Sequence, residues 1–388
     1  FAIASKNIEY TLEYLFFMLV VVARDFIIFA FCRTKGIAIL ESLTAFSLIY
    51  DLFINCVPWS VSTFYMFSAA EAFAAQNFLQ VGKLTNKSFL VMGLTGILTI
   101  LLLTLVIPET FYKVSSSKEA IDSLAAILRW TSIGIIPYSL TYTQLRYLSI
   151  IDKAYIGTLG SIISIVFQVA GCFVFIHVMD KVDFGVGFSI AIGFLILFAI
   201  MFTYMKFWNP YEECLISLEI GMFEDIWSFV YESLSVGLTV FLSYFSLDFP
   251  PYFALIIGDA AFSIVNMLMV FIISLLLFSE CMAVGNNILI NYLIGLKNFN
   301  DIPRVLKVTI YMNIIFVFVI GGAFLVFFST FLRLFTDQDW IIEIAAELRW
   351  YFFFAFMLSN FQNTLSETVI CLGGKTFALL STLLGRFC

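Results

Sequence analysis

Charged residues are scarce in this chain. Only 12% of its 388 residues are Asp, Glu, Lys or Arg, whereas 62% are hydrophobic and the mean hydropathy is +1.03. Soluble domains carry about 25% charged residues, because they must cover a surface that faces water. The scarcity of charge excludes an ordinary soluble domain and fits a protein whose outer surface faces lipid.

Basic stripes and the short motifs of nucleotide or metal chemistry are also missing. The net charge is −7, and phosphate backbones bind to clustered Lys and Arg, so nucleic acid is not expected as a partner. The sequence has no Gly-rich phosphate loop, no HExxH and no CxxC pair. We therefore expect no catalytic residue, no metal site, no resident cofactor and no enzymatic activity.

Histidine and cysteine form no ligand pattern. The single histidine, His177, closes an apolar run and is more typical of an interfacial polar residue than of a ligand. The seven cysteines are widely spaced, and most lie in or beside apolar runs. We interpret them as small hydrophobic residues rather than as metal ligands or disulfides.

Long apolar runs follow one another along the chain. A helix that spans a bilayer needs about 20 mainly apolar residues. The first run has no small-residue cleavage site and is interpreted as a span rather than as a removed signal peptide. An eleventh run begins near Thr376. The chain is thus predicted to be an all-α, multi-pass integral membrane protein with the lipid bilayer as a partner. The first ten predicted spans lie near 11–32, 40–67, 87–107, 124–148, 155–178, 184–207, 229–257, 260–290, 305–331 and 343–371.

One connection is much longer than the others. The segment from Trp208 to Trp227 carries apolar residues on one side and acids on the other, which favours an amphipathic helix at the cytoplasmic membrane interface. An ordinary solvated connection is the alternative. We predict an N-terminal helical lobe at 1–208, an interfacial linker at 209–228 and a C-terminal helical lobe at 229–388.

Sequence features recur at nearly the same spacing in the two halves. AAILRW, which contains Arg129, has its counterpart in AAELRW, which contains Arg349. RDFIIFAF, which contains Asp25, resembles LDFPPYFA, which contains Asp248, and the separation of the two aspartates is almost that of the two arginines. Internal repeats of spanning helices are typical of secondary transporters. We predict two six-helix-type lobes related by this repeat, with the second incomplete and about ten to eleven spans present.

Two of the aspartates inside predicted spans, Asp25 and Asp248, lie at matching places of the two halves. An ionisable residue at bilayer depth costs roughly 2.5–3.5 kcal/mol, so Asp25 and Asp248 should face a partner or a watery cavity. Both are candidates for proton or cation coupling; for Asp25, an ion pair with Arg24 is the alternative. Asp248 is followed by Pro250 and Pro251, which interrupt the helix ladder and indicate a gating kink, with a purely structural kink as the alternative.

Other polar residues in or beside the predicted spans are candidates for lining a transport path. Many such side chains simply form hydrogen bonds between membrane helices, and this is the alternative for each of them. The candidates are Glu71, Gln76, Gln144, Gln168, Asn266 and Asn363.

The order and spacing of several segments resemble the multidrug and toxic compound extrusion (MATE) family of transporters. The resemblance runs from about Leu12 to the end of the chain. Glu71 and Gln76 fall on the acid and the glutamine that end the family's second helix. The similar segments are SAAEAFAAQNFLQVGK at 68–83, the stretch 107–162 with Pro137, FGVGFSIAIG at 184–193, FTDQDWIIEIAAELRW at 335–350, and the Gly-Gly-Lys turn at 373–375.

This resemblance implies roles for the two aspartates, and it also shows departures. Asp25 falls on the first-helix aspartate of prokaryotic members, and Asp248 falls on the second of two seventh-helix acids of eukaryotic members. Ser243 stands at the first of those two acids. The family's fifth-helix Asn-x-x-x-Asp pattern has Gln168 and Cys172 here. These departures put ion coupling in question without changing the expected fold.

Three functional hypotheses follow. The leading one is a secondary antiporter that exports an amphiphilic or cationic organic solute in exchange for H+ or Na+, with coupling at Asp25 or Asp248. The second hypothesis, which the missing acids favour, is a transport-inactive structural subunit bound to other membrane proteins. The third is a lipid or lipid-linked flippase of the same superfamily.

Overall fold

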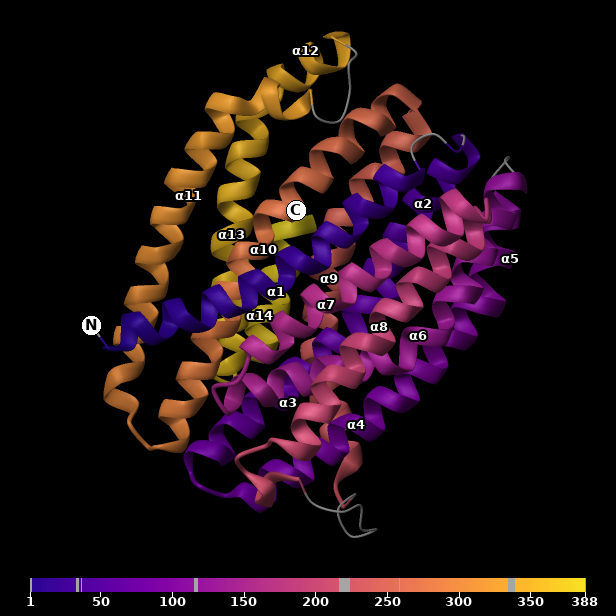
Figure 1. The fold of residues 1–388 in the computed structure, drawn as a ribbon. Helices are drawn as coiled ribbons and strands as arrows, with labels where there is room; N and C mark the ends of the chain where they lie inside the picture. The colour runs from indigo at the N-terminus through magenta and orange to yellow at the C-terminus, as the bar shows by residue number, and fades with distance from the viewer. Residues whose placement is uncertain are drawn as a thin grey trace. The chain divides into compact units, whose positions relative to one another are not determined.

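Helices account for all the regular structure in the part of the chain that the computed structural model describes (Figure 1). The described residues are 2–32, 35, 37–114, 118–215, 224–257, 259–333 and 339–387. The α-helices are α1 (Ala2–Cys32), α2 (Ile37–Ile49), α3 (Cys56–Ala74), α4 (Phe78–Leu101), α5 (Ile107–Val114), α6 (Lys118–Ile150), α7 (Tyr155–Cys172), α8 (Val182–Phe207), α9 (Ile226–Ile257), α10 (Asp259–Gly295), α11 (Ile302–Leu332), α12 (Asp339–Glu347), α13 (Arg349–Cys371) and α14 (Lys375–Phe387). Short π or 3-10 turns are η1 (Tyr50–Asn55), η2 (Leu102–Val106), η3 (Phe173–Val178), η4 (Glu212–Cys214) and η6 (Phe299–Asp301).

Seven helical segments among the described residues are long and apolar enough to cross a membrane. The prediction of an all-helical, multi-pass integral membrane protein is confirmed. The predicted ten to eleven spans are not all among the seven; α13, for example, is long enough, but its Asn, Gln, Ser and Glu residues make it more polar. The seven segments are Ala45–Ala74, Phe78–Tyr112, Lys118–Ile150, Tyr155–Val178, Val182–Phe207, Ile226–Ser243 and Phe299–Thr330.

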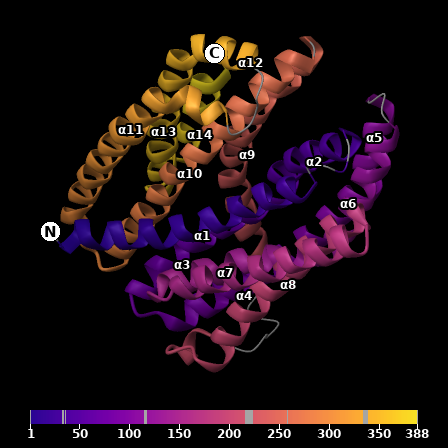
Figure 2. The ribbon, with the colours of Figure 1, turned by 45° about the horizontal axis from the view of Figure 1, so that its top comes forward.

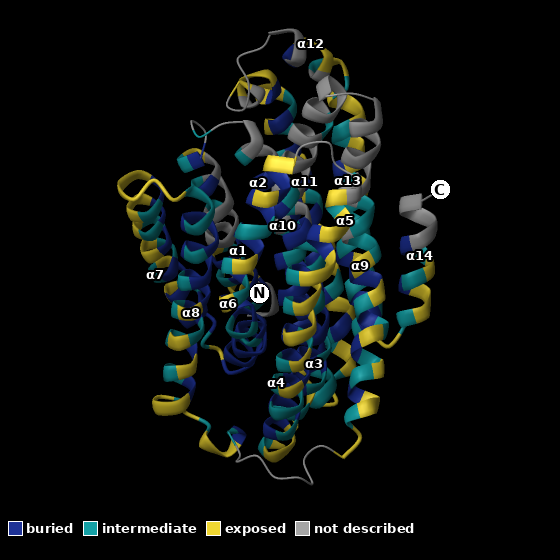
Figure 3. Ribbon diagram, turned by 90° about the vertical axis from the view of Figure 1, so that its right-hand side faces the viewer, coloured by how far each residue is buried: buried dark blue, intermediate teal, exposed yellow. Residues whose placement is uncertain are grey.

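The exposed side of α4 shows how the surface suits lipid. Leu90, Leu94, Leu98 and Leu101 are all exposed, and their spacing of three or four residues places them on one helix face. Exposed residues recur along α4 in Figure 3. Water would disfavour such an apolar stripe, whereas lipid tails solvate it.

Contacts divide the chain into two compact units. The N-terminal unit is Phe16–Phe241, and the C-terminal unit is Phe1–Leu15 with Leu242–Cys388. This division differs from the predicted lobes because the first part of α1 packs in the C-terminal unit, where Asn7 donates a hydrogen bond of 3.0 Å to Thr309. The first part of α9 likewise packs in the N-terminal unit.

Close helix contacts hold the N-terminal unit together. Helices α6 and α8 lie side by side (Figure 2). A Cβ added at Gly187 would lie 2.5 Å from the carbonyl oxygen of Ile127, and one added at Gly134 would lie 2.8 Å from the Cα of Ala191. Small residues allow this approach, which membrane helices use because lipid offers no hydrophobic force to drive their association.

The core of the C-terminal unit is layered along α10, α11 and α13. One apolar cluster contains Leu276, Val317 and Phe356, and a second contains Ile290, Ile302 and Val305. Between them, on all three helices, lies a set of polar residues that we name the polar layer. It consists of Asn286, Asn287, Thr309, Asn313, Asn360, Thr364, Glu367 and Thr368.

The turns that end equivalent helices of the two units share one local structure. Gln76 after α3 and Lys297 after α10 both have φ 57°, and the next backbone N–H donates to the carbonyl five residues before it, at 2.9 Å in each case. Asp152 after α6 (φ 57°) and Gly373 after α13 (φ 89°) form the same pair, with bonds of 2.7 and 2.8 Å. All four are Schellman helix ends. The two pairs are separated by one and the same sequence offset, which is close to that of the repeated segments.

The first residues of the predicted linker form hydrogen bonds with the N-terminal unit and pack against it. Asn209 accepts a hydrogen bond from the Tyr147 hydroxyl at 3.0 Å, and its amide nitrogen lies 2.8 Å from the backbone oxygen of Tyr211. Cys214 in the following 3-10 turn is fully buried. The rest of the predicted amphipathic helix, 216–223, lies outside the described residues. Burial raises the pKa of the Cys214 thiol to about 11, so it carries almost no thiolate near neutral pH.

Cys214 is therefore a probe of this attachment. We expect it to resist maleimide in the native protein at neutral pH and to react at least about tenfold faster in Tyr147→Phe, which lacks the hydroxyl that Asn209 binds. Labelling followed by peptide mass spectrometry measures the rate, with Tyr204→Phe as a matched control elsewhere in the unit. Equal rates in wild type and Tyr147→Phe would show that this contact does not protect the thiol.

Candidate functional site

A π-helical turn lies between α2 and α3 in the N-terminal unit. In this turn, η1, the backbone N–H of Cys56 donates to the carbonyl of Asp51, five residues earlier. Such turns occur frequently at functional sites, because the extra residue changes the direction of neighbouring side chains. Asp51 and Asn55 both lie in η1 and are half-buried, and the Asn55 amide nitrogen donates to the Asp51 carboxylate at 3.0 Å.

Two tyrosines of α6 complete a hydrogen-bond network around Asn55. The Tyr138 and Tyr142 hydroxyls donate to the Asn55 side-chain oxygen at 2.8 and 3.0 Å, and lie 3.0 Å from each other. Both tyrosines are buried and follow Pro137, which removes a backbone donor from the ladder of α6. We call Asp51, Asn55, Tyr138 and Tyr142 the Asp51 network.

Aromatic rings fix the orientation of this network. The Tyr138 ring stacks on Phe194 of α8 with a centroid separation of 3.9 Å, and the Tyr50 ring lies 5.9 Å away on another side. These contacts limit rotation of the phenol and exclude water from around it. Hydrogen bonds in such surroundings are electrostatically stronger than in water.

Trp59 connects the Asp51 network to a buried arginine. Its ring lies edge-on to Tyr142, with centroids 6.2 Å apart, and the Arg146 guanidinium carbon is 4.7 Å from the Trp59 ring centroid. Arg146 is only 1% exposed, and its Nη1 lies 3.6 Å from the Met66 sulfur. The ring contact between Tyr142 and Trp59 therefore joins the Asp51 network to the cation–π pair that Arg146 forms with Trp59.

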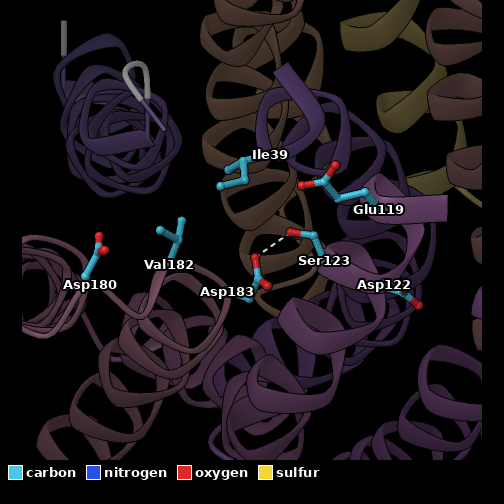
Figure 4. Close-up of a pocket in the computed structure, with 7 residues that line it drawn as sticks. All are labelled: Ile39, Glu119, Asp122, Ser123, Asp180, Val182 and Asp183. Atoms are coloured by element: carbon cyan, nitrogen blue, oxygen red, sulfur yellow. Dashed lines mark hydrogen bonds between the residues drawn. The ribbon is translucent and has the colours of Figure 1, made fainter. Parts of the chain in front are cut away.

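A second feature of the same unit is an acidic pocket of about 550 Å³ (Figure 4). Ser123 donates a hydrogen bond to Asp183, and Lys35 pairs with Asp180 at 2.7 Å. The Lys35 ammonium holds the pKa of the Asp180 carboxyl below its usual range. Four carboxylates give the pocket a negative potential that attracts cations. Its lining residues are Ile39, Glu119, Asp122, Ser123, Asp180, Val182 and Asp183.

The predicted cavity-lining residues that can be placed lie far apart along the chain. Gln144 and Gln168 are buried in α6 and α7, and neither side-chain nitrogen has a hydrogen-bond partner among the described residues. Glu71 is exposed near the end of α3, and Gln76 is exposed in the turn that follows. Asn363 is half-buried on α13.

The remaining predicted site residues have side chains outside the described residues. They are Asp25 on α1, Asp248, Pro250 and Pro251 on α9, and Asn266 on α10. The backbone of α9 stays helical through both prolines. The roles proposed for these five residues remain predictions.

Sequence reasoning did not select the Asp51 network. Asp51 and Asn55 are four residues apart, as are Tyr138 and Tyr142, so each pair lies on one face of its helix. This spacing was the available signal. The spacing could not be recognised as a site from the sequence, because tyrosines are frequent in apolar runs and because the residue that these two bind lies on another helix.

Comparisons with known proteins find similarity to MATE transporters in both sequence and structure. Residues 235–386 match the MatE family model. The eukaryotic MATE transporter AtDTX14 is similar in structure, with a TM-score of 0.88 and 13% identity over 99% of this chain and 85% of that chain. A mutant of the Vibrio cholerae MATE transporter VcmN is also similar, with a TM-score of 0.88 and 15% identity over 100% of this chain and 87% of that chain. A MOP superfamily transporter from Pyrococcus furiosus has a TM-score of 0.85 and 14% identity over 99% of this chain and 86% of that chain. No curated protein matches the sequence significantly.

These findings first define the class: a multi-pass helical membrane protein with the fold of a transporter. The resemblance to the MATE family is confirmed, because the C-terminal part of the chain matches the family's sequence model and the whole chain has the family's fold. Proteins of this family are in general transporters rather than enzymes.

Proposed function

We propose that this chain is a secondary active antiporter, which exports amphiphilic or cationic organic solutes in exchange for H+ or Na+. The observation that supports it most directly is the Asp51 network, a carboxylate linked to an amide and two phenols inside a membrane-spanning unit. Ionisable residues at this depth are costly and usually serve transport.

Ion uptake at the network would change its hydrogen bonds. The charged Asp51 carboxylate accepts a hydrogen bond from Asn55, whereas a protonated carboxyl also becomes a donor and needs an acceptor. The Asn55 oxygen already accepts from both tyrosines, so it has no lone pair left for this new donor, and we propose that the network rearranges. A rearrangement of this kind favours one of two conformations over the other, which is the requirement for coupling. Asp25 on the neighbouring part of the sequence is proposed to share this role.

The charge of the N-terminal unit supports a cationic solute. The acidic pocket has four carboxylates, of which Asp180 is paired with Lys35, so three carboxylates remain to give it a negative charge. A negative pocket raises the local concentration of cations and steers them toward the protein. The solute is expected to be an organic cation with an apolar body, since the lipid bilayer is the other partner.

Proteoliposomes loaded with ethidium test this proposal. Wild type should move ethidium when a proton or sodium gradient is imposed, and Asp25→Asn should abolish the exchange, because an amide keeps the shape of the carboxyl but carries no exchangeable charge. Asp225→Asn, at an exposed turn where φ is 61°, is the matched control and should transport normally.

A wild-type protein that moves no solute under either gradient would overturn the proposal. The second candidate, a transport-inactive structural subunit, would then take its place. It is supported by the buried, uncharged Gln168 and Cys172, which stand where the resemblance places polar and acidic residues.

A further inference from the structure

Helix α11 of the C-terminal unit has an exposed face whose chemistry changes along its length. Arg304 and Lys307 are exposed near its start. Tyr311, Ile315 and Phe318 follow, with exposed fractions of 65%, 62% and 68%. Their spacing of three or four residues places all five side chains on one side of the helix. We call them the α11 row; it begins with two cations, passes a phenol and continues with apolar side chains.

The order of the α11 row matches the layers of one membrane leaflet. Lys and Arg attract anionic headgroups, Tyr is enriched at headgroup level, and apolar side chains face the acyl chains. Tyr311 lies seven residues after Arg304, a rise of about 10 Å, and Phe318 lies about 10 Å further. A phospholipid aligned with the row would place its phosphate beside the cations and its chains beside Ile315 and Phe318.

Both cations of the row can bind an anion. Lys307 forms no salt bridge within the part of the chain that the structure describes. Arg304 donates from Nη1 to Asp301 at 2.6 Å, but its side chain is 74% exposed, and a guanidinium has five N–H donors. Residues three apart on a helix are neighbours, with Cβ atoms about 5–6 Å apart. One phosphate can therefore contact both side chains.

The surroundings of these two cations are basic. The apolar cluster of Ile290, Ile302 and Val305 packs with Cys371, which brings the end of α13 to the start of α11. Segments 292–311 and 369–380 at this end carry one acid, Asp301, and four basic residues. The basic residues are Lys297, Arg304, Lys307 and Lys375.

The start of α1 does not cancel this charge. Lys6 pairs with Glu9 at 3.3 Å, and Glu13 adds one negative charge, which leaves this end of the unit positive. A positive surface favours an anionic lipid over a zwitterionic one.

The apolar part of the row has an equivalent in the N-terminal unit. The sequence offset that relates the paired helix ends also relates α4 to α11. The equivalent α4 residues are all exposed, and they are Leu90 for Tyr311, Leu94 for Ile315 and Ile97 for Phe318. Exposed apolar side chains are thus a general consequence of contact with lipid in both units.

The cationic part has no such equivalent among the described residues. The same offset places the half-buried Lys83 opposite Arg304 and Asn86 opposite Lys307. Lys87, the other lysine near the start of α4, donates to the backbone oxygen of Glu224 at 2.5 Å. Exposed cations in front of an apolar row are therefore a particular feature of α11.

We propose that the α11 row is a binding site for one anionic phospholipid, with the phosphate at Arg304 and Lys307 and an acyl chain along Ile315 and Phe318. The charge of this end and its absence from the equivalent helix carry the inference. Binding does not depend on the proposed transport function.

Native mass spectrometry of the full chain in detergent, with equal amounts of phosphatidylglycerol and phosphatidylcholine of the same chains, tests this site. Wild type should prefer phosphatidylglycerol. Arg304→Gln and Lys307→Gln should each weaken its binding roughly fivefold, the scale of one basic residue at an anionic surface, and leave phosphatidylcholine unchanged. Lys206→Gln is the matched control, because Lys206 is also exposed and lies near an aromatic ring, that of Phe207, in the N-terminal unit.

Each altered side chain is exposed, so every variant should elute as one peak in gel filtration, and Arg304→Lys, which keeps the charge, should retain the preference. Equal binding of the two lipids by wild type would overturn the site. The same result follows if the double variant of Arg304 and Lys307 keeps the preference, or if Lys206→Gln loses as much as that double variant. Glycerol 3-phosphate, which has the phosphate without the chains, should not displace phosphatidylglycerol; displacement at equal concentration would replace the lipid site by a site for free phosphate.

Discussion

Asp51→Asn is expected to lower gradient-driven ethidium exchange by at least about 100-fold, the scale of losing a positioned proton-exchanging group. The asparagine oxygen can still accept from Asn55, so the network and the fold should survive. What is lost is the change of charge that rearranges the Asn55 and tyrosine hydrogen bonds. Exchange in proteoliposomes under an imposed pH gradient measures the loss.

Two further variants separate coupling from packing in the Asp51 network. Tyr138→Phe keeps the ring that stacks on Phe194 but removes one of the two donors to Asn55, so exchange should fall by a smaller factor. Glu109→Gln, which changes an exposed acid of α5 outside both the acidic pocket and the network, is the matched control and should exchange as wild type does. Wild-type exchange by Asp51→Asn, with unchanged pH dependence, would make the network a purely structural feature.

Gly187→Ala is expected to destabilise the N-terminal unit more than any other single methyl group added to a glycine of α4, α7 or α8. The new Cβ would lie 2.5 Å from the Ile127 carbonyl oxygen and 2.8 Å from the Trp130 Cβ, and real Cβ atoms do not approach so closely. Helix α6 must shift away from α8, at a cost of about 1–3 kcal/mol. A thermal unfolding assay in detergent should show a lower midpoint and reduced yield.

Gly93→Ala is the matched control, because a Cβ there meets nothing within 4 Å. Alanine has a higher helix propensity than glycine by about 1 kcal/mol, so this variant should be as stable as wild type or more stable. Equal midpoints for Gly187→Ala and Gly93→Ala would show that the contact between α6 and α8 yields without cost.

Much of the architecture was predictable because it depends on local properties of the chain. Apolar runs of bilayer length predict helices wherever they occur, since lipid leaves no other partner for backbone groups. Repeated segments such as those at Arg129 and Arg349 predicted equivalent halves, and the helix ends at Asp152 and Gly373 repeat in local structure as well. The division into units was less predictable, because the first residues of α1 are placed by Asn7 and Thr309, which are far apart in the sequence.

By itself the sequence determined that this protein is an all-helical, multi-pass membrane protein and that it resembles the MATE family. Composition, run length and the order of motifs carry that information. Only the tertiary structure decided which polar side chains act together. Asn55 reaches two tyrosines of a helix far along the chain, and Asn287 of α10 reaches Glu367 of α13. The cost of a buried polar group depends on whether a partner from another helix satisfies it, and helix packing alone determines that.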